Sequence, residues 1–199
     1  MKGRFTALLL LATLVTFTRP APAGAQPVGD VFRKVSPSVV VIRSKGRDVS
    51  ASGQVRFREI GSGVLVSADG KVMTAAHVVQ AMDEISVEFI GGETVPARVV
   101  ASEPAADLSL LQLDRVPGNV KFARLADSTS VRVGDQVLVV GAPYGLAYSL
   151  SVGYVSARWP PNSVYPAFPL AEFFQTDATI NTGNSGGPCS TGRATLSGS

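Results

Sequence analysis

The chain has a single cysteine, Cys189, among its 199 residues. One thiol cannot form a disulfide within the chain, so core packing has to stabilise the fold, and Cys189 is either free or paired between chains. Concentrated basic runs and basic stripes interleaved with aromatics are also missing, which argues against nucleic-acid binding. The sequence has no internal repeat or heptad pattern and, beyond the N-terminus, no apolar run long enough to span a membrane. What remains is one soluble domain, for which 45% hydrophobic residues supply the core.

The apolar run at the N-terminus has the features of a secretory signal. Basic residues precede the apolar stretch 6–17, and Ala23-Gly24-Ala25 matches the A-x-A cleavage pattern. We expect residues 1–25 to be a signal peptide that is removed on export, so that the mature chain is periplasmic or secreted and begins at Gln26. An uncleaved membrane anchor is the alternative, although a spanning helix needs roughly 20 apolar residues. Removal of the signal takes away three of the 18 basic residues and none of the 15 acidic ones, which leaves the mature chain close to neutral.

Three residues that lie far apart in the chain form a pattern typical of serine proteases. Ser185 stands in the glycine-rich stretch 183–188, the only histidine is His77, and Asp107 lies between them beside an apolar run. The chain order is His, Asp, Ser, with separations of 30 and 78 positions. These separations suit a double β-barrel in which the first two residues come from one barrel and the serine from the other.

Peptide-bond hydrolysis explains why these residue types are needed. A serine hydroxyl is a poor nucleophile at neutral pH, and the imidazole of His77 would take its proton and later return it to the leaving amine. A buried Asp107 carboxylate would hold the imidazole in one tautomer. The glycines permit a tight turn, in which the N–H groups of Gly183 and Ser185 would point at the developing oxyanion and a side chain at Gly183 would obstruct them. This mechanism uses no metal and no cofactor.

Each element also has a plainer interpretation. The glycine-rich stretch could be an ordinary turn or linker, His77 beside two valines could be a core residue, and Asp107 could be a strand-end or turn residue. Taken singly, each signal is weak. Their coincidence, in the right order and with fitting flanks, favours a catalytic triad.

On these residues the chain resembles the HtrA/Deg family of trypsin-like serine proteases. The resemblance implies that His77, Asp107 and Ser185 are the triad, and that the fold is all-β, with two six-stranded β-barrels of the chymotrypsin type. It also implies unfolded proteins or peptides as substrates and assembly as a homotrimer. Valine follows His77, which separates the chain from the disulfide-stapled digestive proteases. The matching stretches tie down most of residues 37–188 and are 61–66, 74–79, 107–113, 141–145 and 175–181.

The resemblance also predicts which substrates the site prefers. Thr179, six positions before the serine, corresponds to the base of the primary pocket, and the adjacent Ile180 would narrow it. A cationic side chain desolvated there would lack a partner, so Arg and Lys should be poor P1 residues and small aliphatic side chains good ones. Asp177 is the alternative, because a shifted loop could bring its carboxylate into the pocket.

The residue pattern predicts strands and loops along the whole chain. The segments 43–60 and 159–170 lack clear periodicity and are assigned as long loops. Residues 26–36 are expected to connect the signal to a protease domain at 37–199, with the N-terminal barrel at about 37–118 and the C-terminal barrel at about 119–199. The predicted strands are 39–43, 62–67, 72–74, 85–89, 95–100 and 108–113 in the first barrel, with a tight turn at Asp69-Gly70, and 137–140, 150–155 and 173–176 in the second.

The segment after Ser185 departs from the family pattern. It contains only 14 residues, and the stretch 189–199 has no alternating apolar run. A chymotrypsin-like barrel needs further strands there, one of which forms a wall of the primary pocket. We therefore expect an incomplete C-terminal barrel and no following PDZ domain. Two functions stay open: an exported serine endopeptidase that works through an acyl-enzyme, or a non-catalytic polypeptide-binding module or inert fragment.

Overall fold

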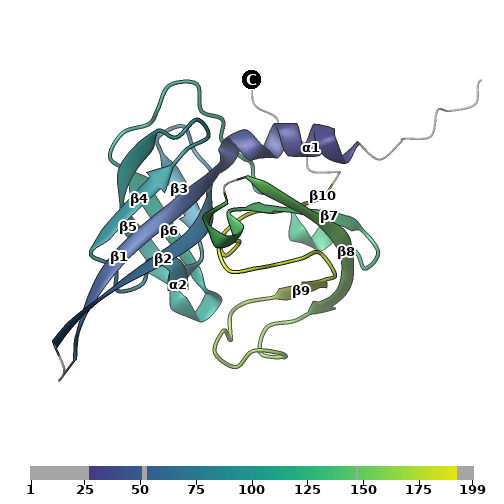
Figure 1. Cartoon of the computed structure of the whole chain (residues 1–199). Coiled ribbons are helices and arrows are strands. Elements are labelled where there is room, and N and C mark those ends of the chain that lie inside the picture. Colours follow the sequence, from purple (N-terminus) through teal and green to yellow (C-terminus); the bar gives the residue numbers. More distant parts are fainter. Residues whose placement is uncertain (1–26, 51–52, 147, 192–199) are drawn as a thin grey trace, which may run out of the picture.

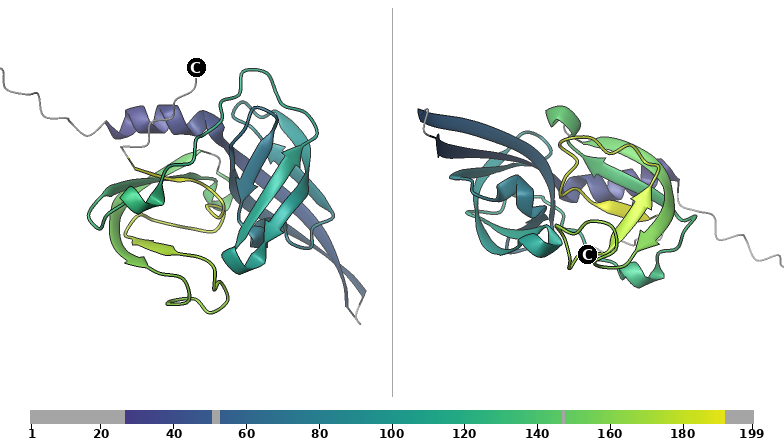
Figure 2. Two further views of the ribbon diagram at one scale, coloured as in Figure 1. Left: turned by 180° about the vertical axis from the view of Figure 1, so that it is seen from behind. Right: turned by 90° about the horizontal axis from the view of Figure 1, so that it is seen from below.

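The computed structural model describes residues 27–50, 53–146 and 148–191, and in them the chain is mostly β-strand with a few short helices (Figure 1). A closed six-stranded barrel is followed by an open sheet of four strands, and helix α1 (Val28–Val35) packs on that sheet. The barrel and the sheet lie side by side (Figure 2). The all-β class and the incomplete second barrel are thus confirmed. Within these described ranges, no helix has the length and apolar character needed to cross a lipid bilayer.

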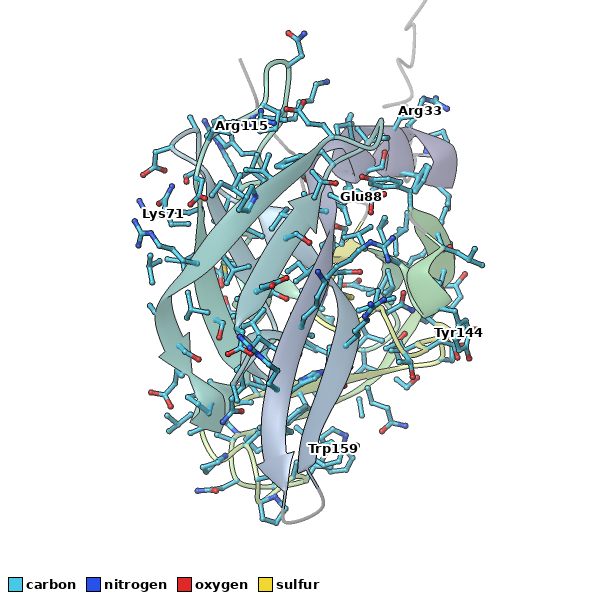
Figure 3. The ribbon with its side chains drawn as sticks, turned by 60° about the vertical axis from the view of Figure 1, so that its left-hand side comes forward. Arg33, Lys71, Glu88, Arg115, Tyr144 and Trp159 are labelled. Carbon is cyan, nitrogen blue, oxygen red and sulfur yellow. The ribbon has the colours of Figure 1, made fainter. Side chains whose placement is uncertain are left out.

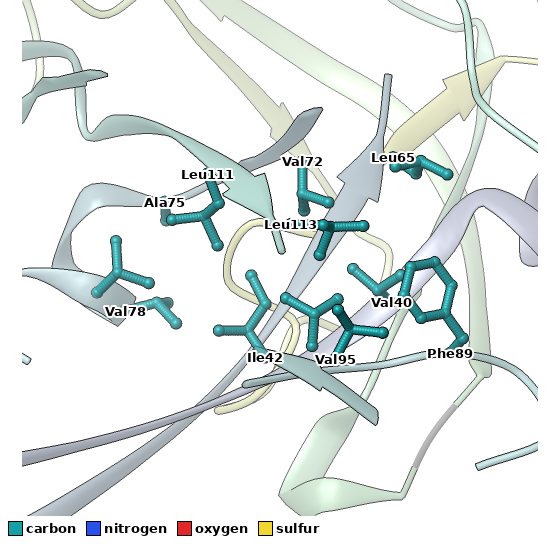
Figure 4. Close-up of a cluster of buried hydrophobic side chains, with 12 residues drawn as sticks. Val40, Ile42, Leu65, Val72, Ala75, Val78, Phe89, Val95, Leu111 and Leu113 are labelled. Atoms are coloured by element: carbon teal, nitrogen blue, oxygen red, sulfur yellow. The ribbon is translucent and has the colours of Figure 1, made fainter. Parts of the chain in front are cut away.

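The first barrel closes in the strand order β1-β2-β3-β6-β5-β4 around aliphatic side chains from all six strands (Figure 4). Strand β1 is buried on both faces, because Val40 and Ile42 join the barrel core while Val39 packs with α1 and the second sheet. A strand buried on both faces favours an unbroken apolar run over alternation. The strands are β1 (Val39–Ser50), β2 (Gly53–Leu65), β3 (Lys71–Thr74), β4 (Glu84–Glu88), β5 (Thr94–Glu103) and β6 (Leu108–Leu113).

The second sheet has the strand order β10-β7-β8-β9 and is apolar on both faces of its central strand. Leu138 and Val140 pack against α1, whereas Val137 and Val139 point the other way, toward Val155. The alternation along β7 therefore separates two small cores. The strands are β7 (Gln136–Gly141), β8 (Ser149–Trp159), β9 (Phe173–Thr176) and β10 (Cys189–Thr191).

The predicted hairpin between β2 and β3 is confirmed. Val64 pairs with Met73 and Leu65 with Val72, and Gly70 has a φ of +89° in the connecting turn. The glycine is needed there, because that backbone region is strained for a residue with a Cβ. The turn leads into β3, which ends at Thr74, shortly before the segment that carries His77.

The prediction of a loop at 43–60 is wrong. The two strands β1 and β2 form a continuous ribbon through this segment, paired from Val39 with Val64 to Ser50 with Gly53. Its polar residues misled the sequence analysis because alternate side chains of β1 face solvent and form ion pairs with β4 and the residue before it. Arg43 pairs with Glu88 at 2.9 Å, Lys45 with Glu84 at 2.9 Å and Arg47 with Asp83 at 3.0 Å. Polar side chains in this pattern belong to an exposed strand.

The two ends of the described chain also differ from expectation. Most of the segment 26–36 is the helix α1, which is held by Val31 and Val35, one helical turn apart on its buried face. The stretch after the glycine-rich turn, in which no strand was expected, contains β10, paired with β7. The loop predicted at 159–170 is confirmed, since no strand forms between the end of β8 and Phe173. The predicted signal peptide 1–25 lies outside the described residues.

Candidate active site

His77 and Asp107 meet at one edge of the first barrel. His77 lies in the short helix α2 (Ala76–Val79), which follows β3, and Asp107 stands immediately before β6. Thr74 at the end of β3 pairs with Ser109 at the start of β6. Because these strands are antiparallel, the residue after one and the residue before the other come together. Asp107 has a φ of 52°, a left-handed conformation that aspartate tolerates better than most residues.

The Asp107 carboxylate binds both the side chain and the backbone of His77. His77 Nδ1 lies 2.8 Å from Oδ2 and 3.0 Å from Oδ1, and the His77 backbone N–H donates to Oδ1 at 3.0 Å. A carboxylate accepts from Nδ1–H, which fixes the neutral imidazole in the tautomer whose Nε2 carries the free lone pair. The Asp107 side chain is 23% exposed, so it is less buried than the sequence suggested, and that of His77 is 55% exposed.

Ser185 lies in a tight turn that only glycine permits on either side. Gly183 has a φ of +102° and Gly186 a φ of +81°. A Cβ at Gly183 would collide with the Ala142 carbonyl oxygen, and one at Gly186 with the Ser62 carbonyl oxygen. Among the described residues, the N–H groups of Gly183 and Ser185 donate no hydrogen bond. The hydroxyl of Ser185 likewise has no hydrogen-bond partner in that part of the chain.

The serine turn is hydrogen-bonded to strand β2 of the first barrel. The Ser62 backbone N–H donates to the Ser185 carbonyl at 2.8 Å, and the Ser62 hydroxyl donates to the Gly183 carbonyl at 2.7 Å. Gly61 is so close to both the Ser185 carbonyl and the side chain of Val78 that a Cβ there would lie 3.2 Å and 2.6 Å from them. Val78 follows His77 directly. The structure thus places the serine turn against the histidine segment, although no hydrogen bond joins His77 to Ser185.

A cavity of about 540 Å³ opens beside Ser185 over the inner face of the second sheet. Asn184, Ser185 and Ile180 line it together with the apolar residues Val139, Val155 and Phe174. Thr179, which the resemblance places at the pocket base, is exposed and does not line this cavity. The arrangement gives the space beside Ser185 an apolar wall.

The two acidic residues nearest to this cavity already have donors. Asp177 does not line it, and its carboxylate accepts the Tyr154 backbone N–H at 2.6 Å. Asp127 lines the rim, where it accepts from both the hydroxyl and the backbone N–H of Thr129, at 2.7 and 2.9 Å. These hydrogen bonds lower the pKa of Asp127. Within the described residues, no group of three or more His, Cys, Asp or Glu side chains could hold a metal ion.

Comparison with known proteins places this geometry in a family. The sequence profile described as "Trypsin-like peptidase domain" matches residues 61–196. The chain belongs to this trypsin-like peptidase family and is HtrA-like. It is 41% identical over 133 residues to a probable periplasmic serine endoprotease DegP-like of Halomonas elongata, which covers 66% of this chain and 27% of that protein. It is 40% identical over 135 residues to the periplasmic serine endoprotease DegP of Escherichia coli K12, which covers 67% of this chain and 28% of that protein.

Solved structures of HtrA-type proteases are similar to this trypsin-like peptidase chain. The protease AlgW with a decapeptide has a TM-score of 0.72 and 28% identity, over 84% of this chain and 56% of that chain. The same protease with a tripeptide has a TM-score of 0.72 and 30% identity, over 84% of this chain and 52% of that chain. This trypsin-like peptidase chain therefore spans little more than a quarter of its curated relatives and about half of its structural ones.

Two residues of this trypsin-like peptidase that sequence reasoning left without a role lie at the site. Ser62 was noted only as part of a family motif, yet it is completely buried and binds the serine turn. Cys189 lines both the cavity beside Ser185 and a second cavity of about 410 Å³, between the barrel and the sheet, that reaches Asp107. Burial of its thiol raises the pKa of Cys189, which disfavours the reactive thiolate. The one sequence signal for Ser62 is a serine placed between two glycines, Gly61 and Gly63.

Proposed function

We propose that this chain is the protease domain of an exported serine endopeptidase. In it, Ser185 is the nucleophile and His77 the general base and acid. Asp107 orients the imidazole and stabilises the imidazolium that forms when His77 takes a proton. The observation that carries the proposal is the bond of His77 Nδ1 to the Asp107 carboxylate at 2.8 Å, beside a serine turn with two uncommitted N–H groups.

The reaction would proceed through an acyl-enzyme. His77 Nε2 takes the Ser185 hydroxyl proton as Oγ attacks the carbonyl carbon of the peptide bond, and the carbonyl oxygen becomes an oxyanion. The N–H groups of Gly183 and Ser185 stabilise that charge. His77 then gives its proton to the leaving amine, the C–N bond breaks, and the acyl group stays on Ser185. Water then attacks the acyl carbon while His77 takes its proton. The bond to Ser185 Oγ breaks, His77 returns the proton to Oγ, and the carboxylic acid is released.

The substrates we propose are unfolded proteins with small aliphatic residues at P1. The apolar wall of Val139, Val155 and Phe174 beside Ser185 favours such side chains. Among the described residues that line the cavity, a lysine or arginine would meet one carboxylate, that of Asp127, which already accepts two hydrogen bonds. Ile180 is 60% exposed and lines the cavity, and in this proposal it closes the pocket over the bound side chain.

Export and assembly belong to the same proposal. The relatives are named as periplasmic proteins, and the sequence pattern of residues 1–25 supports a periplasmic location for this chain as well. The homotrimer implied by the family resemblance is a further proposal, which light scattering of the purified chain would test through its molar mass.

Hydrolysis of reduced casein tests the enzymatic proposal. We expect the unsubstituted chain to cleave casein and the variants Ser185→Ala and His77→Ala to show no activity in a routine assay, because loss of a triad member can cost on the order of a million-fold. A variant that still cleaves would remove the corresponding residue from the mechanism.

Peptide binding without hydrolysis is the second candidate. The observation that favours it is that, within the described residues, the second sheet beside Ser185 is open and does not close into a barrel. Such a protein, immobilised on a column, would retain unfolded casein, and the casein eluted from the column would be uncleaved. Covalent reaction of Ser185 with a fluorophosphonate separates the two functions, because only an assembled catalytic serine reacts quickly.

A further inference from the structure

Ser62 makes hydrogen bonds through every polar group of its backbone and side chain. It lies in β2, has no solvent exposure, and connects three segments that are distant in sequence. The hydroxyl donates to the Gly183 carbonyl at 2.7 Å and accepts the Ala142 backbone N–H at 2.9 Å. The Ser62 carbonyl accepts the Thr74 hydroxyl at 2.7 Å. One small side chain thus connects the first barrel, the end of β7 and the serine turn.

We propose that Ser62 is a positioning residue, whose hydroxyl holds the backbone N–H groups of the serine turn in the orientation that binds the oxyanion. The inference rests on the proposed function and adds a residue to it. Ser62 touches neither the substrate nor the reacting atoms, and acts through Gly183, Ser185 and Ala142.

The planar peptide unit transmits the anchoring of a carbonyl to its N–H group. The C=O and N–H of one peptide unit point in opposite directions, so an anchored carbonyl fixes where its N–H points. The unit that supplies the Gly183 N–H carries the Thr182 carbonyl, which accepts the Tyr144 N–H at 2.9 Å. The next unit has both ends held, because the Gly183 carbonyl accepts from Ser62 and the Asn184 N–H donates to Asn181 at 3.0 Å.

The Ser62 hydroxyl couples these two anchors. By accepting the Ala142 N–H it fixes the strand end that leads, two residues later, to the Tyr144 N–H. By donating to the Gly183 carbonyl it fixes the other side of the same glycine. The Tyr144 side chain is 72% exposed and lies at the outer surface (Figure 3), so this residue contributes through its backbone alone.

The surroundings leave these anchors little freedom to change. A Cβ at Gly141 would lie 3.0 Å from the Ser62 hydroxyl and 2.6 Å from Asn184 Oδ1, so the strand end and the serine turn are in close contact there. A hydroxyl has one proton to donate, and that of Ser62 is used on Gly183. Alanine at this position would leave both the Gly183 carbonyl and the Ala142 N–H buried without a partner.

The variants Ser62→Ala and Ser62→Cys test the proposal, with Ser38→Ala as the matched control. Ser38 is also buried, at 1% exposure, and its hydroxyl donates to one backbone carbonyl, that of Val35, at 2.7 Å. Ser38 makes no bond to the serine turn, so its variant reports the cost of losing a buried serine alone. Cysteine has the shape of serine with a somewhat larger Sγ and is a weak donor and acceptor, so it serves if the alanine variant does not fold.

Kinetics of peptide cleavage give the first measurement. We expect Ser62→Ala and Ser62→Cys to lower kcat by about ten- to a hundredfold, less than outright loss of an oxyanion donor, with KM within about twofold. Ser38→Ala should keep kcat within about twofold of the unsubstituted chain. An unchanged kcat in the folded Ser62 variants, or an equal loss in Ser38→Ala, would overturn the proposal while leaving the proposed function intact.

Amide hydrogen exchange gives a second measurement that needs no activity. The Ala142 N–H loses its acceptor in the Ser62 variants and should exchange faster, while it should be unaffected in Ser38→Ala. If the unsubstituted chain reacts with no fluorophosphonate, the proposed function fails, and Ala142 exchange then decides the positioning role alone. Unchanged exchange at Ala142 in both Ser62 variants would contradict that role.

Discussion

Alanine at Gly183 separates the strain of the serine turn from its proposed role in catalysis. An added Cβ there would overlap the Ala142 carbonyl oxygen and lie 3.1 Å from the Tyr144 nitrogen, in a backbone with a φ of +102°. Gly134 is the matched control, because its φ of +91° is similar and no atom lies within 4 Å of its added Cβ. The strained backbone destabilises both alanine variants, whereas a steric collision destabilises only Gly183→Ala.

The expected magnitudes differ accordingly. We expect Gly134→Ala to lose about 1–3 kcal/mol of unfolding free energy from the strained backbone. Gly183→Ala should lose a similar amount plus about 1–3 kcal/mol for the collision. Because the turn must move to relieve that collision, the Gly183 N–H should leave the oxyanion position, and kcat should fall by about 10²–10³. Urea unfolding and peptide cleavage on both variants measure the two effects. Equal destabilisation of the two variants with kcat retained in Gly183→Ala would refute the reasoning.

Three further predictions concern specificity, a buried phenol and export. Mass-spectrometric mapping of cuts in reduced casein should show cleavage after valine, alanine and isoleucine, and cuts mainly after lysine or arginine would refute the apolar pocket. The buried Tyr148 hydroxyl has no hydrogen-bond partner within the described part of the chain, so Tyr148→Phe should be as stable at pH 7 or about 1 kcal/mol more stable. Burial raises the pKa of Tyr148 to about 12, whereas the phenol of the unfolded chain ionises near its ordinary pKa of about 10. The unsubstituted chain should therefore lose stability relative to Tyr148→Phe as the pH rises from about 10 to 12. A difference between the urea midpoints of the two proteins that is the same at pH 7 and at pH 11 would contradict this. Intact mass of exported protein should correspond to a chain that begins at Gln26, and a retained Met1 would favour the anchor.

Local patterns in the sequence were sufficient to predict the strands that position His77 and Asp107. Alternating and β-branched runs are visible in β3 and β6, and a glycine after an aspartate marks the turn before β3. The ribbon of β1 and β2 was missed because Arg43 and Lys45 on β1 face solvent and form ion pairs with acidic residues of β4, and a polar exposed strand resembles a loop when read alone. The helix α1 was missed for a related reason, since its two buried valines are too few to mark a period in a short segment.

The site could be predicted only as far as its residue types. The sequence predicted a triad of His77, Asp107 and Ser185, and the structure brings the first two of these together. It could not show that Thr179 lies outside the cavity or that Asp177 is engaged by the Tyr154 backbone, because both depend on the register of β8 and the turn after β9. The several bonds of Ser62 arise where β2, β7 and the serine turn meet, and a contact between three distant segments leaves no local pattern.

The covalent reaction of Ser185 with a fluorophosphonate tests the central claim most directly. Such a reagent reacts quickly only with a serine that has an assembled base and oxyanion site, and peptide mass spectrometry identifies the modified residue. We predict a single adduct on Ser185 in the unsubstituted chain, none in Ser185→Ala, and strongly slowed labelling in His77→Ala. A folded chain that forms no adduct on Ser185 while still binding unfolded casein would contradict the enzymatic account and favour the peptide-binding one.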